Sequence, residues 1–423
     1  MMKAKITLLL LIATIFVQAQ QVKGIYGDSN WFTNWTNFRP ATTEYRTSTQ
    51  ILTGIISSNM TLSRTNTYQL VGVVYVTNKA ILTIESGTVI RGDKESCGTL
   101  VITKGCKIMA EGNETAPIIF TSNNNVSDRR PGDWGGIIIL GDAPINRIGG
   151  VGYLDLNLIP EVSYYGGNNE DDNSGILKYV RIEYSGRKLK ATKELNGLSL
   201  AGVGRKSQFE FIQVSYSNDD SFECYGGNVN FKNVISYRAT DDDFDYTQGA
   251  QSTITNSTAI RDPFSFDTSG SRCFEIDSAD KSENFDSSKK LTKIEANNIT
   301  FLNTQENVQG LVREAIYIKD KSFLSLTNSV ISGFEAVALL DSKISIINSN
   351  LNRISFQGVI ANNCTEKFIS EQPTLNTEIM QWFDNEVFNI VYSKVTNGNF
   401  FLQPALKNYP DFRMKIQATF ANR

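Results

Sequence analysis

The chain has 423 residues, of which 40% are hydrophobic and 20% charged, and it contains no histidine. Histidine is the commonest general base and a frequent zinc ligand, so its absence excludes Ser-His-Asp catalysis, Cys-His catalysis and zincin-type metal sites. Any chemistry must therefore depend on Asp, Glu, Lys, Arg or Tyr, alone or with a hard metal ion.

Residues 1–19 are predicted to form a secretory signal peptide. Lys3 and Lys5 precede an apolar run from Ile6 to Val17, and Val17-Gln18-Ala19 has the small-residue pattern of a cleavage site. The run is too short to span a membrane, and no later segment approaches the roughly 20 apolar residues that a spanning helix needs. We therefore expect an exported protein without a transmembrane segment, located at the cell surface or in the periplasm.

The charge of the mature chain gives no reason to expect nucleic acid as a partner. Loss of the two signal-peptide lysines leaves 39 basic and 44 acidic residues, a net charge of −5. Binding to nucleic acid or to an anionic membrane is favoured by a basic surface, which this balance does not provide.

The five cysteines are an odd number, so at least one must stay unpaired within the chain. They are Cys97, Cys106, Cys224, Cys273 and Cys364. Cys97 and Cys106 are the best candidate pair, because nine residues could carry the chain round one turn and back. Buried free thiols explain the set equally well.

Short strands rich in Val, Ile, Thr, Phe and Tyr recur along the chain and are separated by Gly, Asn and Asp. Asparagines followed by a short apolar run mark the repeat, at Asn233, Asn256, Asn298, Asn328 and Asn348, and Gln213 opens the series. The spacings are 23, 42, 30 and 20 residues. We interpret the first and last as single coils, 42 as two coils of 21, and 30 as one coil with an inserted loop.

This repeat predicts an all-β fold, a right-handed parallel β-helix (solenoid) in which equivalent residues stack about 4.8 Å apart. Asn suits the turn because it tolerates left-handed backbone angles, and its amide can bond to the amides above and below. The alternative is a β-sandwich with asparagines in hairpin turns, but the regular spacing argues against it.

A solenoid needs atypical segments that cover its open ends. We expect an N-terminal cap over residues 20–70, the parallel β-helix over 71–365 and a C-terminal cap over 366–423. Residues 377–383 are the stretch that most resembles a helix.

Two consecutive coils carry the densest cluster of charge. Residues 218–227 and 240–249 lie 22 residues apart and contain seven carboxylates: Asp219, Asp220, Glu223, Asp241, Asp242, Asp243 and Asp245. Stacked like charges are costly unless a cation, arginines or protons relieve them. Calcium fits, since it takes 6 to 8 oxygen ligands. The alternatives are turn-capping aspartates, neutralised by arginines, and a catalytic carboxylate pair.

Arg238 and Arg261 each lie five residues after the Asn of their coil, as does Arg353, so the first two should be neighbours near the acidic turns. An arginine beside bound calcium would suit a polysaccharide lyase, in which calcium acidifies the α-proton that the arginine removes. Simple neutralisation of the aspartates is the alternative.

Tyrosines near the acidic segments predict a surface on which sugar rings stack. Tyr225 and Tyr246 are the main candidates, and the other tyrosines of the set are Tyr164, Tyr165, Tyr184, Tyr216 and Tyr237. Packing in the core is the alternative, and it also explains Phe222 and Phe244 as equivalent positions on adjacent coils.

Several blocks occur in the same order as in a known family. They include Gly132-Asp133-Trp134-Gly135-Gly136, Tyr165-Gly166-Gly167, the segment 172–184 and both acidic segments. On these blocks the chain resembles a family of secreted, largely uncharacterised β-helix surface proteins of Bacteroidota.

The resemblance implies a surface protein, often exported to the cell exterior. Together with the acidic patch, it favours a non-enzymatic scaffold that binds a polysaccharide or a partner protein, with calcium as the candidate ion. A calcium-dependent polysaccharide lyase and an accessory subunit of an outer-membrane transport or assembly complex are the alternatives.

Overall fold

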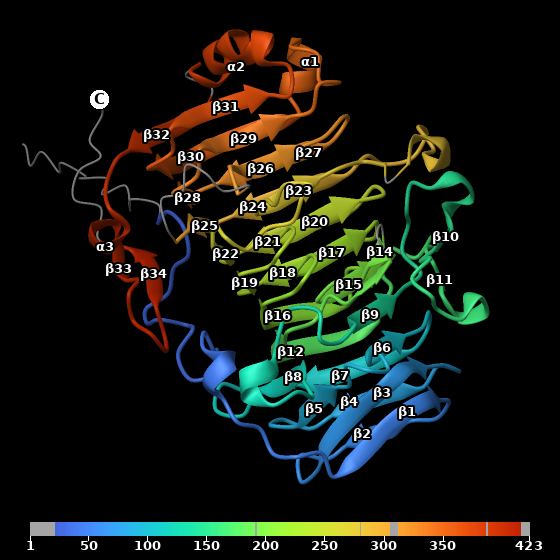
Figure 1. Ribbon diagram of the computed structural model, residues 1–423. Coiled ribbons are helices and arrows are strands. Elements are labelled where there is room, and N and C mark those ends of the chain that lie inside the picture. Colours follow the sequence, from blue (N-terminus) through green and yellow to red (C-terminus); the bar gives the residue numbers. More distant parts are fainter. Residues whose placement is uncertain (1–21, 191–192, 280, 305–311, 386–387, 416–423) are drawn as a thin grey trace, which may run out of the picture.

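The computed structural model describes residues 22–190, 193–279, 281–304, 312–385 and 388–415, so the signal peptide expected at 1–19 lies outside the described residues. The described chain winds into a parallel β-helix in which each coil lies on the one before (Figure 1). Its strands form three parallel sheets around an apolar interior, here called sheets I, II and III in the order in which the chain passes through them. The predicted fold class is confirmed.

The strands of each sheet follow one another along the solenoid, and several long strands bend and contribute to two sheets. Sheet I contains β2 (Met60–Leu62), β4 (Ile81–Ile84), β7 (Lys107–Glu111), the first parts of β12 (Gly175–Glu183) and β16 (Gln208–Ser215), β18 (Asn230–Lys232), β21 (Gln251–Thr255), β24 (Lys293–Asn297), β27 (Phe323–Thr327) and the first part of β30 (Ile354–Asn362). Sheet II contains the first parts of β1 (Gln50–Ile56) and β3 (Thr67–Val76), β5 (Val89–Gly92), β8 (Ile118–Ser122), the second parts of β12 and β16, β19 (Ile235–Tyr237), β22 (Thr258–Arg261), β25 (Thr300–Asn303), β28 (Val330–Ser332), the second part of β30 and β32 (Asn389–Ser393).

Sheet III carries the candidate site. It contains the second parts of β1 and β3, β6 (Thr99–Ile102), β9 (Gly136–Leu140), β15 (Leu198–Ala201), β17 (Phe222–Tyr225), β20 (Phe244–Thr247), β23 (Phe274–Ile276), β26 (Glu314–Ile318), β29 (Ala336–Leu340) and β31 (Glu366–Ser370).

Short elements lie outside the three sheets. The hairpins are β10 (Gly152–Tyr153) with β11 (Tyr164–Tyr165), β13 (Lys188–Lys190) with β14 (Lys193–Glu194), and β33 (Phe401–Gln403) with β34 (Asp411–Met414). The helices are α1 (Asn348–Leu351), α2 (Asn376–Phe383) and α3 (Asn397–Phe400), with 3-10 turns η1 (Pro40–Thr42), η2 (Val126–Asp128), η3 (Ile148–Gly150), η4 (Pro160–Val162), η5 (Ser282–Asn284) and η6 (Pro373–Leu375). No helix in the described ranges is long and apolar enough to cross a membrane.

The interior is built from alternate residues of each strand, which point inward while their neighbours point to solvent. In sheet III, Phe222, Phe244 and Phe274 occupy one inward column, and the rings of the first two stack with centroids 5.0 Å apart. Burying one such side chain contributes about 1.5–3 kcal/mol. Packing in the core therefore accounts for Phe222 and Phe244.

The asparagine series lies at the bend between sheets I and II. Asn233, Asn256, Asn298 and Asn328 have φ of 55°, 49°, 56° and 48°, in the left-handed region that Asn tolerates. Tyr179 and Phe211 hold the equivalent place in the two preceding coils of the series, with φ of 51° and 53°.

Three details of the predicted repeat are wrong. Gln213 pairs with Ile235 inside sheet II, two residues beyond the bend. The 42 residues between Asn256 and Asn298 form one coil, since Thr255 pairs directly with Asn297, and the extra length leaves the solenoid as loops. Asn348 begins helix α1, and Gly358 takes the bend after Asn328.

The N-terminal segment runs along the side of the solenoid, although the sequence predicts an end cap there. The backbone N–H of Tyr26 donates to Asn256 Oδ1 at 2.8 Å, and Asn298 Nδ2 donates to the carbonyl of Val22 at 2.7 Å. The Asn256 and Asn298 side-chain amides therefore form hydrogen bonds with the N-terminal segment. The predicted hydrogen bonds between asparagine amides of successive coils are not their main contact. Parallel strands begin at Gln50 and end at Ser393, so the solenoid extends into both ranges expected for caps.

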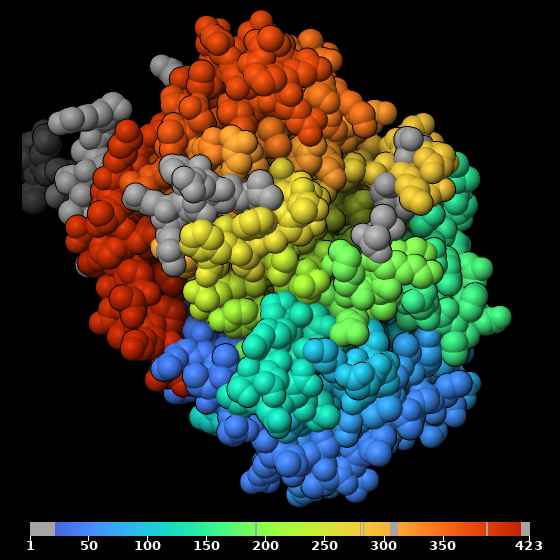
Figure 2. Space-filling view, viewed as in Figure 1, coloured from blue at the N-terminus to red at the C-terminus, as the bar shows by residue number. Residues whose placement is uncertain are grey.

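The first and last described segments of the chain meet on the outer face of sheet II. Phe32 and Trp35 pack with Ile235 and Ile260 of the sheet, and Phe412 of the C-terminal hairpin joins the same apolar cluster. Figure 2 shows the blue N-terminal and red C-terminal segments side by side. At the C-terminal end of the solenoid lies α2, which contains the helix expected at 377–383.

All five cysteines are free thiols in the structure. Cys106 belongs to the interior of the solenoid, whereas Cys97 packs outside it, in the cluster beneath the loop that carries β10. Strand β6 separates the two, which excludes the Cys97–Cys106 disulfide and supports the free-thiol alternative.

Candidate functional site

The register of sheet III brings the two acidic segments together. Glu223 of β17 pairs with Asp245 of β20, so the turns that precede these strands are also neighbours. The backbone N–H of Asp242 donates to Asp220 Oδ1 at 2.9 Å, across the two turns. The 22-residue spacing is therefore one coil, as the sequence indicates.

These turns and strands line a cleft of 530 Å³ on the outer side of sheet III, here called the acidic cleft. Among the described residues, its lining contains nine carboxylates and three cationic side chains. The carboxylates are Glu194, Asp219, Asp220, Glu223, Asp241, Asp242, Asp245, Glu275 and Glu371, and the cations are Lys193, Arg272 and Lys319. Six of the seven carboxylates selected from the sequence thus share one cavity.

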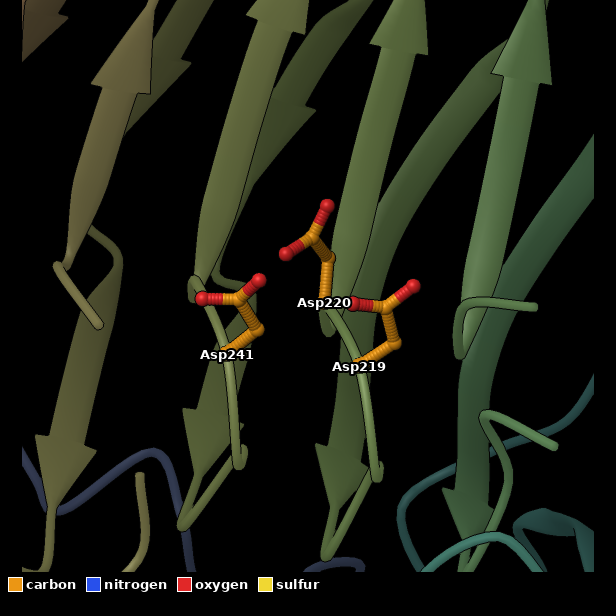
Figure 3. Close-up of side chains that lie close together, drawn as sticks. All are labelled: Asp219, Asp220 and Asp241. Atoms are coloured by element: carbon orange, nitrogen blue, oxygen red, sulfur yellow. The ribbon is translucent and has the colours of Figure 1, made fainter. Parts of the chain in front are cut away.

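Two groups of three carboxylates have oxygens close enough to hold one ion each. Asp219, Asp220 and Asp241 form one group, which Figure 3 shows at the base of two neighbouring strands, and Asp220, Glu223 and Asp245 form the other. In each group the ligand oxygens lie within 4.8 Å of one another. A calcium ion holds its oxygens at about 2.4 Å, so two of its ligands can be up to about 4.8 Å apart. Asp220 belongs to both groups.

Burial and mutual repulsion make these carboxyl groups weak acids. Burial, followed by the neighbouring carboxylates, raises the pKa of Asp219, Asp220, Asp242 and Asp245 well above the ordinary value. Burial also raises the pKa of Glu223 and that of Asp241, each to about 7. One oxygen of Asp245, Oδ1, is buried and has no hydrogen-bond partner in the described structure. At neutral pH the cleft must therefore bind protons or a cation.

Asp243, the seventh carboxylate, lies inside the solenoid and does not reach the cleft. It occupies the position of Ser221 one coil earlier, and Ser236 donates to it. Arg261 pairs with it at 3.0 Å, and neither side chain is exposed. Asp243 is thus no candidate ligand for an ion in the cleft, and Arg261 is no binding residue. This pair fits the neutralisation alternative.

Arg238 is the register neighbour of Arg261, as predicted, but it points the other way. Its φ of 57° is left-handed, and its guanidinium lies 5.3 Å from the Tyr237 ring centroid and 3.2 Å from Asp262. Arg353 instead bonds to Asn350, because its coil contains α1. The expected row of arginines beside the acidic turns is therefore not formed.

The tyrosines do not form one platform. Tyr225 lines the cleft and donates to Glu223, but Tyr246 is fully buried against Phe274. The inward position of Tyr246 follows from the alternation that also buries Phe244. The rest of the tyrosine set is divided among other places: Tyr165 and Tyr184 are buried, Tyr164 is exposed on β11, Tyr184 stacks on Tyr216, and Tyr216 contacts Tyr237.

Several residues of the cleft were not selected as site residues from the sequence. Glu275 follows Phe274 as Asp245 follows Phe244, so a repeated Phe-acid pair was a signal that could have located it. Lys319 pairs with Glu275, and the Arg272 guanidinium lies 4.9 Å from the Tyr317 ring centroid and 3.4 Å from Glu314.

The fold and the cleft together define a parallel β-helix protein with an anionic cleft on one sheet. The chain belongs to the family of pectate-lyase-like β-helix domains, whose model matches residues 54–399. No curated protein matches the chain.

Two solved structures are similar to the chain at 11% identity. For the enzymatically active domain of tailspike protein 2 from bacteriophage CBA120 the TM-score is 0.26, with 81% of this chain and 42% of that one covered. For the full-length tailspike protein 2 from Escherichia coli O157:H7 bacteriophage CAB120 the TM-score is 0.28, with 81% and 38% covered. The chain thus spans less than half the length of either.

Proposed function

We propose that this protein is an exported envelope or surface scaffold that binds calcium in the acidic cleft and, through the ion, an anionic polysaccharide. The observation that carries the proposal is the pair of carboxylate groups that share Asp220, in a cleft with nine carboxylates and only three cations among its described residues. Hard oxygen ligands suit calcium, and a cation bound there would relieve the repulsion that raises the carboxyl pKa values.

The open form of the cleft suits a polymer. The groove lies on the outside of consecutive coils, and Tyr225 and Tyr317 line it together with the carboxylates. A calcium ion with incomplete protein coordination could accept carboxylate oxygens of a uronate residue. Aromatic rings beside the ion would supply apolar surface to the sugar.

A calcium-dependent polysaccharide lyase is the second candidate, and the cations of the cleft disfavour it. Lys319 pairs with Glu275, and this carboxylate is among the groups that raise its pKa, so the ammonium holds its proton. Arg272 pairs with Glu314. Lys193 pairs with Asp155. A lyase needs a base that removes a proton, and none of these three ion-paired cations is placed to act as one.

Calorimetric titration of the metal-free protein with calcium tests the proposal. We expect saturable binding, followed by calcium-dependent binding of polygalacturonate. Absence of calcium binding by the folded protein would overturn it. Appearance of unsaturated uronate absorbance during incubation would show that the lyase alternative is correct.

A further inference from the structure

A second groove, on the outer face of sheet I, has the opposite chemistry to the acidic cleft. It is a cavity of 650 Å³ that crosses β21, β24, β27 and β30, and it is here called the amide groove. Among the residues that the structure describes, its lining contains one lysine and one glutamate, Lys23 and Glu295, and its other side chains are mainly hydroxyls and amides. Glu295 is also paired with Lys293 at 2.5 Å, so the groove carries little net charge.

The lining residues form two rows in strict register. Thr255, Asn297, Thr327 and Gln357 are successive neighbours in one row, and Thr253, Glu295 and Ser325 are successive neighbours in the other. Both rows point outward because the residues between them, such as Ile254 and Leu326, are buried in the interior. Each coil thus presents one or two hydrogen-bonding side chains about 4.8 Å from those of the next coil.

Two smaller cavities adjoin the amide groove. A second cavity of 210 Å³ shares Thr253 and Glu295 with it, and a third of 280 Å³ shares Asn228 and Gln251 with the second. The amide groove itself follows the long axis of the solenoid, because its lining comes from successive coils, and this form suits a linear polymer better than a small molecule. The two smaller cavities lie towards the start of the sheet I strands and carry the cations Arg205, Lys289, Lys290 and Lys293, so they differ in chemistry from the amide groove.

The amides are fixed before any ligand arrives. Asn297 Oδ1 accepts from Thr327 Oγ1 at 2.9 Å and from Asn328 Nδ2 at 3.2 Å, so the Asn297 Nδ2 group is left to donate outward. Lys23 Nζ in turn donates to Asn328 Oδ1 at 3.0 Å. Within the described chain, the Thr255 and Ser325 hydroxyls are not engaged in hydrogen bonds to the protein. Because these donors are already held in place, less side-chain conformational entropy is lost when a ligand binds.

From these observations we infer that the amide groove binds a linear, uncharged polysaccharide, extended along the solenoid axis. Sugar hydroxyls both donate and accept hydrogen bonds, as do the amides and hydroxyls of the groove. The spacing between coils is close to the length of one pyranose ring, so successive sugars could meet successive coils. Within the amide groove itself, the low net charge disfavours an acidic polymer, and the near absence of apolar side chains disfavours a protein surface. This site is separate from the acidic cleft and does not depend on calcium.

The test uses the mature protein and the hexasaccharides of cellulose, xylan, mannan and laminarin, with galacturonate hexamer for comparison, in titration calorimetry with EDTA present. We expect at least one neutral hexamer to bind and the acidic one not to bind. Asn297→Asp keeps the acceptor for Thr327 and Asn328 but removes the outward donor, so it should weaken binding about tenfold, and Ser325→Ala should weaken it further.

Asp220→Asn, in the acidic cleft, is the matched control and should leave neutral-sugar binding unchanged. The inference is overturned if no neutral hexamer binds, if only the galacturonate hexamer binds, or if Asn297→Asp with Ser325→Ala binds like the natural protein. Failure of calcium binding in the acidic cleft would leave this result unaffected, so the two proposals fail separately.

Discussion

Replacing Asp220 by Asn should change stability in opposite directions with and without calcium. Asp220 belongs to both groups of three carboxylates in the acidic cleft, and its Oδ1 accepts a hydrogen bond from the backbone N–H of Asp242. The amide oxygen of Asn can keep that hydrogen bond while one negative charge is removed. The substitution therefore tests charge with little change in shape.

The expected magnitude follows from the distances in the cleft. Two carboxylates with oxygens 4.8 Å apart repel each other by about 3.5 kcal/mol at an effective dielectric constant of about 20. Bound protons and water reduce this repulsion, so we expect metal-free Asp220→Asn to be more stable by about 1–2 kcal/mol, or about 1–2 °C in Tm for a chain of this length. Calcium at about 100 times its Kd adds about 2.7 kcal/mol, or about 3 °C, to the natural protein.

Differential scanning calorimetry at pH 8, with EDTA or with calcium, measures both effects. The natural protein should gain about 3 °C with calcium, and Asp220→Asn should gain less than about 1 °C. Glu366→Gln, an exposed acid on β31, is the matched control and should respond like the natural protein. A full calcium response in Asp220→Asn, or a metal-free variant that is less stable than the natural protein, would refute the reasoning.

Three further outcomes are expected. The metal-free protein should lose stability as pH rises from about 4.5 through about 7, because Glu223 and Asp241 keep protons in the folded state that the unfolded chain has already released. Urea unfolding at pH 5 and pH 8 measures this loss. A variant with Gln at 223 and Asn at 241 should show a smaller difference between the two pH values, and the remainder comes from Asp219, Asp220, Asp242 and Asp245, whose pKa values are also raised. Arg261→Leu should lower the free energy of unfolding by about 3–5 kcal/mol, because it leaves the Asp243 carboxylate buried without its partner. Adding Asp243→Ser, which introduces the residue found at this position one coil earlier, should restore much of the lost stability. If the double variant is no more stable than Arg261→Leu, the proposed role of the ion pair is wrong. The denatured protein, without reductant, should show five thiols with Ellman's reagent, whereas three would indicate a disulfide that the structure excludes.

The solenoid could be predicted because each coil repeats the same local pattern. The left-handed Asn at the bend, the apolar alternation and the 22-residue spacing of the acidic segments are all local features. The 42-residue coil between Asn256 and Asn298 was misinterpreted because loops add length without changing the register of the strands. Residues 22–38 were misplaced because no repeat encodes where a segment outside the coils will pack.

The acidic cleft could be predicted in part for the same reason. Outward carboxylates at equivalent positions of adjacent coils must be neighbours, and this located Glu223 and Asp245. The period of two could also have assigned Tyr246 to the interior, since Phe244 is inward. The orientations of Arg238 and Arg261 could not be predicted from the sequence. Arg238 has a left-handed backbone conformation, so its side chain points away from the interior of the solenoid, whereas the side chain of its register neighbour Arg261 points into it.

The contact between the first and last described segments on sheet II has a consequence for folding. In most solenoids each repeat contacts only its neighbours, so assembly can proceed from any point and the ends can fray independently. Here Arg413 donates to the carbonyl of Gly27, across 386 residues of sequence, and Tyr26 bonds to Asn256. The segment around Gly27 can complete its contacts only after the residues around Arg413 have been synthesised. We therefore expect slow, cooperative folding. A truncation that removes the C-terminal hairpin should also prevent the distant N-terminal segment from packing on sheet II.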